Sequence, residues 1–130
     1  MRLLLDTDIL IDILADRKFF VDDAKRIIQS TDIICISALS VRDTFLFAQD
    51  RDPSVSSETM ENFVSFFEIL PVPVKIIKAA FRSEIKDIED AIQEQTAKAN
   101  MIDFIITRDK HFLKSEVRSL SPKEYLEKKL

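Results

Sequence analysis

The fold is decided by an apolar strand that runs directly into a helix, RLLLDTDILIDILAD (residues 2–16). Leu3, Leu4 and Leu5 form a continuous apolar run, which is typical of a strand buried on both faces. The residues from Ile9 to Asp16 have the apolar content of a short helix. Two aspartates, at positions 6 and 8, therefore follow the end of a buried strand.

Strands and helices continue to alternate along the chain. We predict further strands at residues 33–36, 68–71, 104–107 and 117–120. We predict helices at 20–30, at 37–50 with Ser37 as N-cap, from Ser56 or Ser57 onward, at 73–81, at 87–100 and from residue 121. This order predicts a single α/β domain over residues 1–130, with a central, mostly parallel sheet of about five strands and helices on both faces.

The composition excludes several classes of protein. The chain has no glycine, so no glycine-rich phosphate loop, dinucleotide turn or G-x-S-x-G elbow can form. Its one cysteine, Cys35, lies in an apolar run and reads as a buried residue; a disulfide scaffold or a zinc cluster is excluded. No apolar run reaches the length of a membrane span, and Asp6 and Asp8 come too early for a signal peptide, so we expect a cytoplasmic protein.

Acidic residues recur where a parallel sheet places its ligand site, beyond the carboxyl ends of the strands. Asp6 and Asp109 follow strands, Asp43 lies early in a helix that follows a strand, and Asp90 lies early in a helix that leads into one. Clustered carboxylates repel one another unless a cation neutralises them, and oxygen ligands suit Mg²⁺ or Mn²⁺. Such ions can activate water for attack on a phosphodiester.

The segments that carry these acids resemble the motifs of the PIN domain family, and in particular of small bacterial VapC-like members. The resemblance covers nearly the whole chain, and the third and fourth segments are the most specific. They are LLLDTDIL (3–10), ISALSVRD (36–43), EDAIQ (89–93) and FIITRDKHF (104–112). The resemblance implies a PIN-like fold and Mg²⁺- or Mn²⁺-dependent hydrolysis of RNA at the aspartate cluster. It also implies an RNA substrate and an antitoxin protein as partners.

The resemblance carries specific roles to residues of this chain. Asp6, Asp90 and Asp109 match the metal-binding acids of the family, and Asp43 stands where most active members have glutamate. Aspartate is one methylene shorter, so Asp43 would reach an ion directly or through water. Asp8 stands where asparagine is usual and is a supporting residue.

Three further interpretations concern residues around the fourth segment. Thr107 could orient a carboxylate or a water, or could be an ordinary strand-end residue. Arg108 could contact an RNA phosphate or pair with an acid near the site, and the crowded carboxylates favour the pairing. Arg108, Lys110 and Lys114 begin a C-terminal stretch in which seven basic residues oppose four acids, in a chain of net charge −4. These cations would steer the RNA backbone.

Other readings of the sequence stay open. A PIN-like module that binds RNA or a protein without cleavage is motivated by Asp43 and by the acidic net charge. A haloacid-dehalogenase phosphatase or a phospho-receiver domain fits the first acids but not the T-R-D-x-x-F segment. Five phenylalanines are consistent with core packing and equally with a surface for a homodimer or an antitoxin: Phe45, Phe47, Phe63, Phe66 and Phe67.

Overall fold

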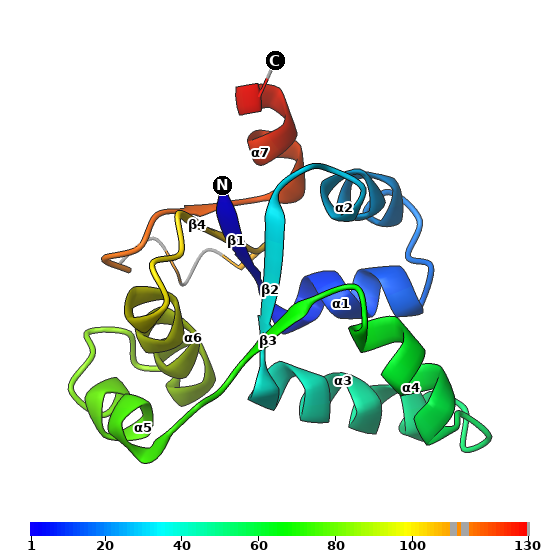
Figure 1. Ribbon diagram of the computed structural model, residues 1–130, viewed down its shortest axis with the longest axis horizontal. Coiled ribbons are helices and arrows are strands. Elements are labelled where there is room, and N and C mark those ends of the chain that lie inside the picture. The colour runs from blue at the N-terminus through cyan, green and yellow to red at the C-terminus, as the bar shows by residue number, and fades with distance from the viewer. Residues whose placement is uncertain (110–111, 113–114, 130) are drawn as a thin grey trace.

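The computed structural model describes residues 1–109, 112 and 115–129. Within them, five strands form one sheet in the order β3-β2-β1-β4-β5, and each neighbouring pair is parallel (Figure 1). The strands are β1 (Arg2–Leu5), β2 (Ile33–Ser37), β3 (Glu68–Leu70), β4 (Phe104–Ile106) and β5 (Ser119–Leu120). The helices are α1 (Thr7–Leu14), α2 (Val21–Ile28), α3 (Ala38–Arg51), α4 (Ser57–Val64), α5 (Val74–Ala80), α6 (Ile88–Ala99) and α7 (Pro122–Lys129). The predicted α/β fold is confirmed.

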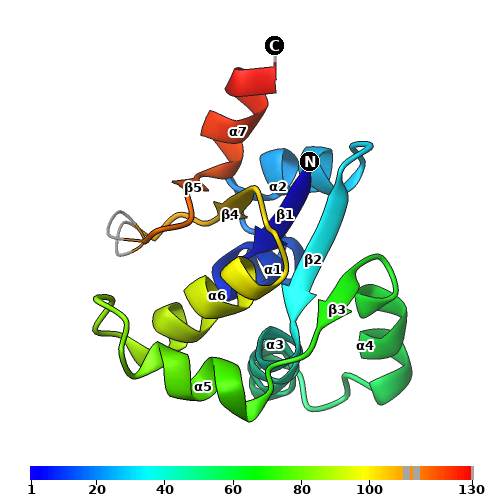
Figure 2. The same cartoon turned by 60° about the vertical axis from the view of Figure 1, so that its left-hand side comes forward.

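Alternate residues of each central strand enter two separate apolar cores. Leu3 and Leu5 of β1 pack with α1, α2 and Tyr125 of α7, whereas Leu4 packs with Cys35 and with α5 and α6 on the opposite face. Figures 1 and 2 show α5 and α6 together on one side of the sheet and α1 and α2 on the other. Because both faces are covered, the central strands are apolar throughout, as the continuous run of leucines indicates.

The strand order places a crevice between β1 and β4. From β1 the chain crosses to β2 on one side, and it later returns to β4 on the other side of β1. Such a reversal leaves the loops at the two carboxyl ends splayed apart, which is where open α/β sheets bind ligands. Asp6 follows β1 and Asp109 follows β4 by three residues, so both lie at this crevice.

Two element boundaries differ from the sequence prediction for identifiable reasons. Helix α1 begins at Thr7 instead of Ile9, because the carboxylate of Asp6 accepts a hydrogen bond from the Thr7 amide and caps the helix. Strand β5 covers only Ser119–Leu120, and the amide of Val117 donates to the Ser115 hydroxyl instead of to a neighbouring strand. Ser37 caps α3 as predicted, accepting from the amide of Ser40.

The structure also bears on two smaller expectations about apolar residues. Cys35 is fully buried, and burial raises the pKa of its thiol to about 11, so it behaves as a core residue. The phenylalanines divide: Phe67 is buried and Phe63 packs against the core, whereas Phe66 is 71% exposed. No described helix has both the length and the apolar character needed to cross a bilayer.

Candidate metal centre

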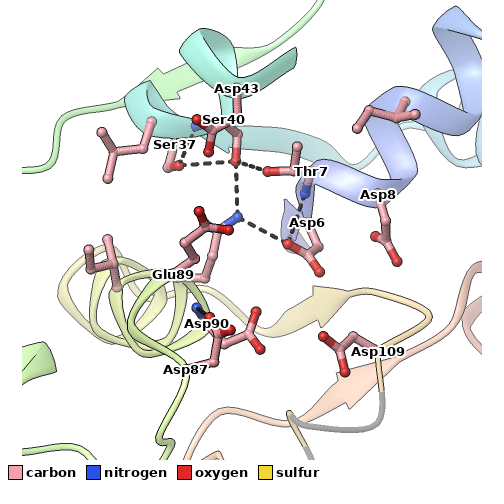
Figure 3. Close-up of a pocket in the computed structure, with 14 residues that line it drawn as sticks. Asp6, Thr7, Asp8, Ser37, Ser40, Asp43, Asp87, Glu89, Asp90 and Asp109 are labelled. Atoms are coloured by element: carbon pink, nitrogen blue, oxygen red, sulfur yellow. Dashed lines mark hydrogen bonds between the residues drawn. The ribbon is translucent and has the colours of Figure 1, made fainter. Parts of the chain in front are cut away.

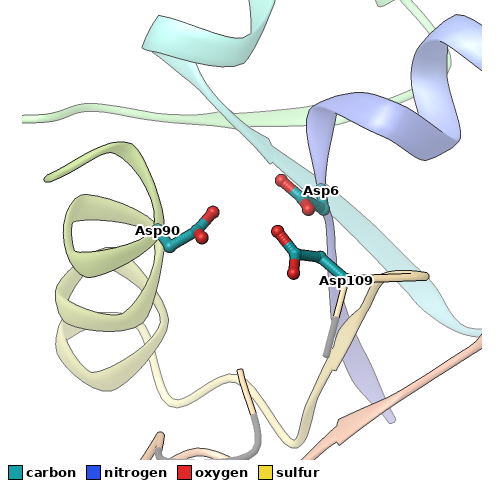
Figure 4. Close-up of side chains that lie close together, drawn as sticks. All are labelled: Asp6, Asp90 and Asp109. Atoms are coloured by element: carbon teal, nitrogen blue, oxygen red, sulfur yellow. The ribbon is translucent and has the colours of Figure 1, made fainter. Parts of the chain in front are cut away.

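Three aspartates from three different elements meet at the crevice. Asp6 lies at the end of β1, Asp90 in the first turn of α6 and Asp109 in the loop after β4. One carboxylate oxygen of each lies within 4.8 Å of the other two, and the side chains point toward one another (Figure 4). Asp6 and Asp90 are buried, and Asp109 is half-buried. Three of the four acids predicted as catalytic therefore come together.

Local structure fixes where each of these carboxylates points. Asp87 caps α6 by accepting from the amide of Asp90, which holds the first turn of the helix at the crevice. The Thr107 hydroxyl donates to Asp6 Oδ2 at 2.8 Å, and it accepts from the amide of Asp109 at 2.9 Å. Thr107 therefore connects two of the three acids, and its role in orienting a carboxylate stays a prediction.

Gln93 and Ser40 form a second support that sequence reasoning missed. The Gln93 side-chain amide donates to the Ser40 hydroxyl at 3.0 Å and, more weakly, to Asp6 Oδ1 at 3.4 Å. Ser40 also shares a hydrogen bond with the Thr7 hydroxyl, so α1, α3 and α6 are joined beneath the site (Figure 3). The available signal was a polar residue one helical turn after Asp90, on the same face of α6.

The predicted acids Asp8 and Asp43 line the same cavity, of about 320 Å³, without joining the group of three. Asp43 projects from α3, is 32% exposed and forms a salt bridge of 2.9 Å with Arg42. Asp8 Oδ2 accepts from the backbone amide of Arg108, and its Oδ1 is buried with no hydrogen-bond partner among the described residues. Gln93 Oε1 is a second such buried oxygen.

Burial makes the negative charge at this site unfavourable. Desolvation is the main cause that raises the pKa of Asp6, with hydrogen bonds from Thr107, Thr7 and Gln93 opposing it. For Asp8, burial and then the nearby charge of Asp6 raise the pKa to about 6. A bound cation would relieve both effects, because it stabilises the ionised form. Carboxylate oxygens held close together with unfavourable charge are the donor set that a hard divalent ion prefers, so the residues fit Mg²⁺ or Mn²⁺.

The cationic side chain of Arg108 is paired with an acid outside the group of three. Its guanidinium forms a two-pronged salt bridge with Asp12, with N–O distances of 2.8 and 2.9 Å, and these contacts raise the pKa of Arg108. Asp12 is fully buried, and Arg17 lies 3.4 Å from it. The predicted pairing of Arg108 with an acid is confirmed, whereas contact with RNA stays a prediction. Lys110 and Lys114 lie outside the described residues.

Comparison with known proteins agrees with this geometry. Residues 2–111 match the family model described as PIN domain. No curated protein matched the chain. Solved structures with the same fold include VapBC2 from Rickettsia felis bound to a DNA fragment from their promoter, with 14% identity and a TM-score of 0.71 over 93% of this chain and 98% of that one. A toxin-antitoxin complex from Klebsiella pneumoniae has 24% identity and a TM-score of 0.70 over 92% and 96%.

Proposed function

The chain belongs to the PIN domain family, and from this premise we propose that it is a ribonuclease dependent on Mg²⁺ or Mn²⁺. The observation that carries the proposal is the convergence of Asp6, Asp90 and Asp109, whose carboxylate oxygens lie within 4.8 Å of one another. Carboxylates that are held this close repel one another unless a cation neutralises them, which favours a cation site in this cavity.

The three carboxylates would hold the ion, and a bound ion supplies a more acidic water and stabilises negative charge that develops on a phosphodiester. The chain's own residues prepare the site. Thr107 and Gln93 fix the two oxygens of Asp6 by hydrogen bonds, so little reorganisation is needed when a cation enters. Asp87 holds Asp90 at the start of α6, and burial of Asp6 and Asp90 excludes bulk water from two of the ligands.

Asp43 and Asp8 surround the cavity from the side of α3 and α1. We propose that the Asp43 carboxylate would orient a water at the edge of the cavity and accept its proton, since Asp43 lines the cavity but lies outside the tight group. Asp8 adds negative charge behind Asp6. Arg108, Lys110 and Lys114 would bind the RNA backbone, which predicts that activity falls as salt concentration rises.

The Klebsiella pneumoniae structure described above is a toxin-antitoxin complex. We therefore propose that this chain is a toxin whose partner is an antitoxin protein, and that RNA is its substrate. Expression of the wild-type chain without a partner in a bacterial host should arrest growth, whereas Asp90→Asn should not. Asp50→Asn is the matched control, because Asp50 is an exposed acid at the far end of α3, and this variant should arrest growth like the wild type.

The decisive experiment combines metal binding with cleavage. Titration calorimetry with Mn²⁺ on the wild type, Asp90→Asn and Asp50→Asn should show binding that only Asp90→Asn loses. Single-stranded and structured RNA incubated in parallel should be cut by the same variants that bind Mn²⁺. Wild-type protein that binds no Mn²⁺ would contradict the metal centre, and equal cleavage by Asp90→Asn would contradict its role.

A module that binds without cleavage is the second candidate, favoured by the salt bridge that turns Asp43 toward Arg42. Asp43→Glu distinguishes the two candidates, because glutamate is one methylene longer. If Asp43 limits the reaction, this variant should cleave RNA faster than the wild type at equal Mn²⁺. Binding of Mn²⁺ and RNA with no cleavage by either protein would favour the second candidate. A homodimer, the other partner suggested by the sequence, would appear directly in sedimentation analysis.

A further inference from the structure

The loop between α1 and α2 exposes an aromatic side chain that packing does not explain. Residues 17–20, here called the RKFF loop, form a turn in which the Arg17 carbonyl accepts from the amides of Phe20 and Val21. Phe19 has φ of +79° at the turn position that glycine usually occupies. A residue with a Cβ is strained there, and the Phe19 ring is 86% exposed, so burial does not compensate the strain. We therefore interpret the exposed Phe19 ring as a functional side chain.

The RKFF loop is joined to the metal centre through Arg108. The guanidinium of Arg108 lies over the ring of Phe20, 3.9 Å from its centroid, while both prongs of the same guanidinium bind buried Asp12. The backbone amide of Arg108 donates to Asp8, and Asp109 is the next residue. The loop is thus in contact, through Arg108, with the segment that carries one of the three clustered acids.

The chemistry of the loop fits a nucleic acid strand. Two cations precede the two rings, and Lys18 Nζ lies 5.6 Å from the centroid of Phe19. Exposed rings beside cations bind single strands, because bases stack on the rings while phosphates contact the cations. Here Lys18 is that cation, since Arg17 pairs with Asp12. Two other rings in turns are strongly exposed: Phe66 is flanked in sequence by Ser65 and Phe67 and then Glu68, with no cation, whereas Phe81 is followed by Arg82. Lys18 and the exposed Phe19 ring, in a loop that contacts the segment of Asp109 through Arg108, indicate a local surface for RNA.

We propose that Phe19 is a stacking platform for a base of the single-stranded RNA substrate, a proposal that rests on the function proposed above. Asp6 caps the start of α1, and the RKFF loop follows the end of that helix. An eight-residue helix is about 12 Å long, which corresponds to about three or four stacked nucleotides. Phe19 therefore binds a base several nucleotides from the bond that is cut and selects substrates long enough to reach it.

The test measures binding without divalent cations, so that it does not depend on cleavage. Fluorescence anisotropy in EDTA with an unstructured RNA of about 12 nucleotides compares the wild type, Phe19→Ala, Phe19→Trp and the matched control Phe66→Ala. Phe19→Ala should bind about 5- to 100-fold more weakly, while Phe19→Trp and Phe66→Ala should bind like the wild type. Because the Phe19 ring is exposed, its removal should leave the thermal melting curve unchanged.

A series of RNAs with one abasic position locates the stacked base. In the wild type, one abasic position should weaken binding as much as Phe19→Ala does, and in Phe19→Ala the same position should have no effect. Equal RNA binding by Phe19→Ala and wild type would overturn the proposal and leave the ring as a contact for a protein partner. A wild type that does not bind RNA would overturn it as well.

Cleavage in Mn²⁺ separates this proposal from the function on which it rests. Phe19→Ala should cut the long RNA more slowly than the wild type and should cut a dinucleotide at the same rate. If the wild type cleaves and Phe19→Ala is equal to it on both substrates, only the stacking platform fails. If the wild type binds RNA through Phe19 but does not cleave with any divalent ion, the nuclease fails and the platform stands.

Discussion

Folding lowers the pKa of a carboxyl group at one edge of the parallel sheet and raises the pKa of carboxyl groups at the other edge. At the amino edge, Asp32 precedes β2 and accepts hydrogen bonds of 2.7 Å from both Lys129 and the Tyr125 hydroxyl. Although burial opposes it, these bonds hold the pKa of Asp32 at about 2. At the carboxyl edge, burial raises the pKa of Asp6, and burial together with the charge of Asp6 raises the pKa of Asp8 to about 6.

The contrast separates residues that stabilise the fold from residues kept for function. Asp32 joins β2 to α7 and is more stable ionised in the folded chain than in the unfolded chain. Asp6 and Asp8 destabilise the folded chain when ionised, and the elements that carry the acids of the crevice are nevertheless fixed by caps and by Thr107 and Gln93. A site that is costly for the fold and yet rigidly built is typical of a binding site for an opposite charge.

The largest effect is expected from Asp6→Asn, which removes the charge at the centre of the carboxyl edge. An amide is a weaker ligand than a carboxylate, and removal of groups that only support a ligand already costs about 10- to 100-fold. Asp6→Asn should therefore lower Mn²⁺ affinity and RNA cleavage by about 100-fold or more. Calorimetry and cleavage rates check this, and retention of both would show that the acids at this edge are not a metal centre.

A smaller loss is expected from Thr107→Val, which keeps the shape of the side chain and removes the hydroxyl that connects Asp6 and Asp109. Mn²⁺ affinity should fall about 10- to 100-fold, and the free energy of unfolding should fall by about 1 kcal/mol. Thr59→Val is a matched control, because Thr59 is exposed on α4, far along the chain from the site. An equal loss of affinity in both variants would show that Thr107 does not position the acids.

Both the fold and the convergence of three acids could be predicted from sequence. The run Leu3–Leu5 fixes a strand covered on both faces, and the parallel order that follows places Asp6 and Asp109 at one edge. Asp90 joins them because a helix that leads into a parallel strand begins at that same edge. These inferences depend only on periodicity and chain direction, which the sequence contains.

The partners of individual side chains could not be predicted. Asp12 is a buried acid in an apolar helix, which signals a buried ion pair, but the sequence cannot say that Arg108 lies opposite. Ser40 and Gln93 are 53 positions apart in the sequence and lie on different helices. Their contact beneath Asp6 depends on how α3 and α6 pack against each other. The start of α1 was missed because Asp6 serves both as helix cap and as a site residue.

The amino edge should respond to substitution through stability alone. Asp32→Asn removes the ionised partner of Lys129, so the free energy of unfolding at neutral pH should fall by about 1–2 kcal/mol, which allows for the exposure of Lys129. A carboxyl group whose pKa is lowered by folding stabilises the folded chain at pH values above its unfolded-state pKa, which is near 4. The difference between wild type and variant should therefore shrink as pH falls from 4 toward 2. Urea titrations across this range check it; Mn²⁺ binding should be unchanged, and Asp50→Asn should show no such difference.

The smallest expected effect is a gain in stability, which is opposite in sign to the loss expected for Asp32→Asn. Asp8→Asn removes a half-buried charge that burial and Asp6 disfavour, while the asparagine oxygen can still accept from the amide of Arg108. In EDTA at pH 7.5 the free energy of unfolding should rise by about 1 kcal/mol, whereas Asp32→Asn lowers it. Mg²⁺ should reduce the gain, because a cation bound by the neighbouring acids compensates the same charge. A loss of stability in EDTA would show that Asp8 supports the fold as Asp32 does, and the two edges would then not differ in kind.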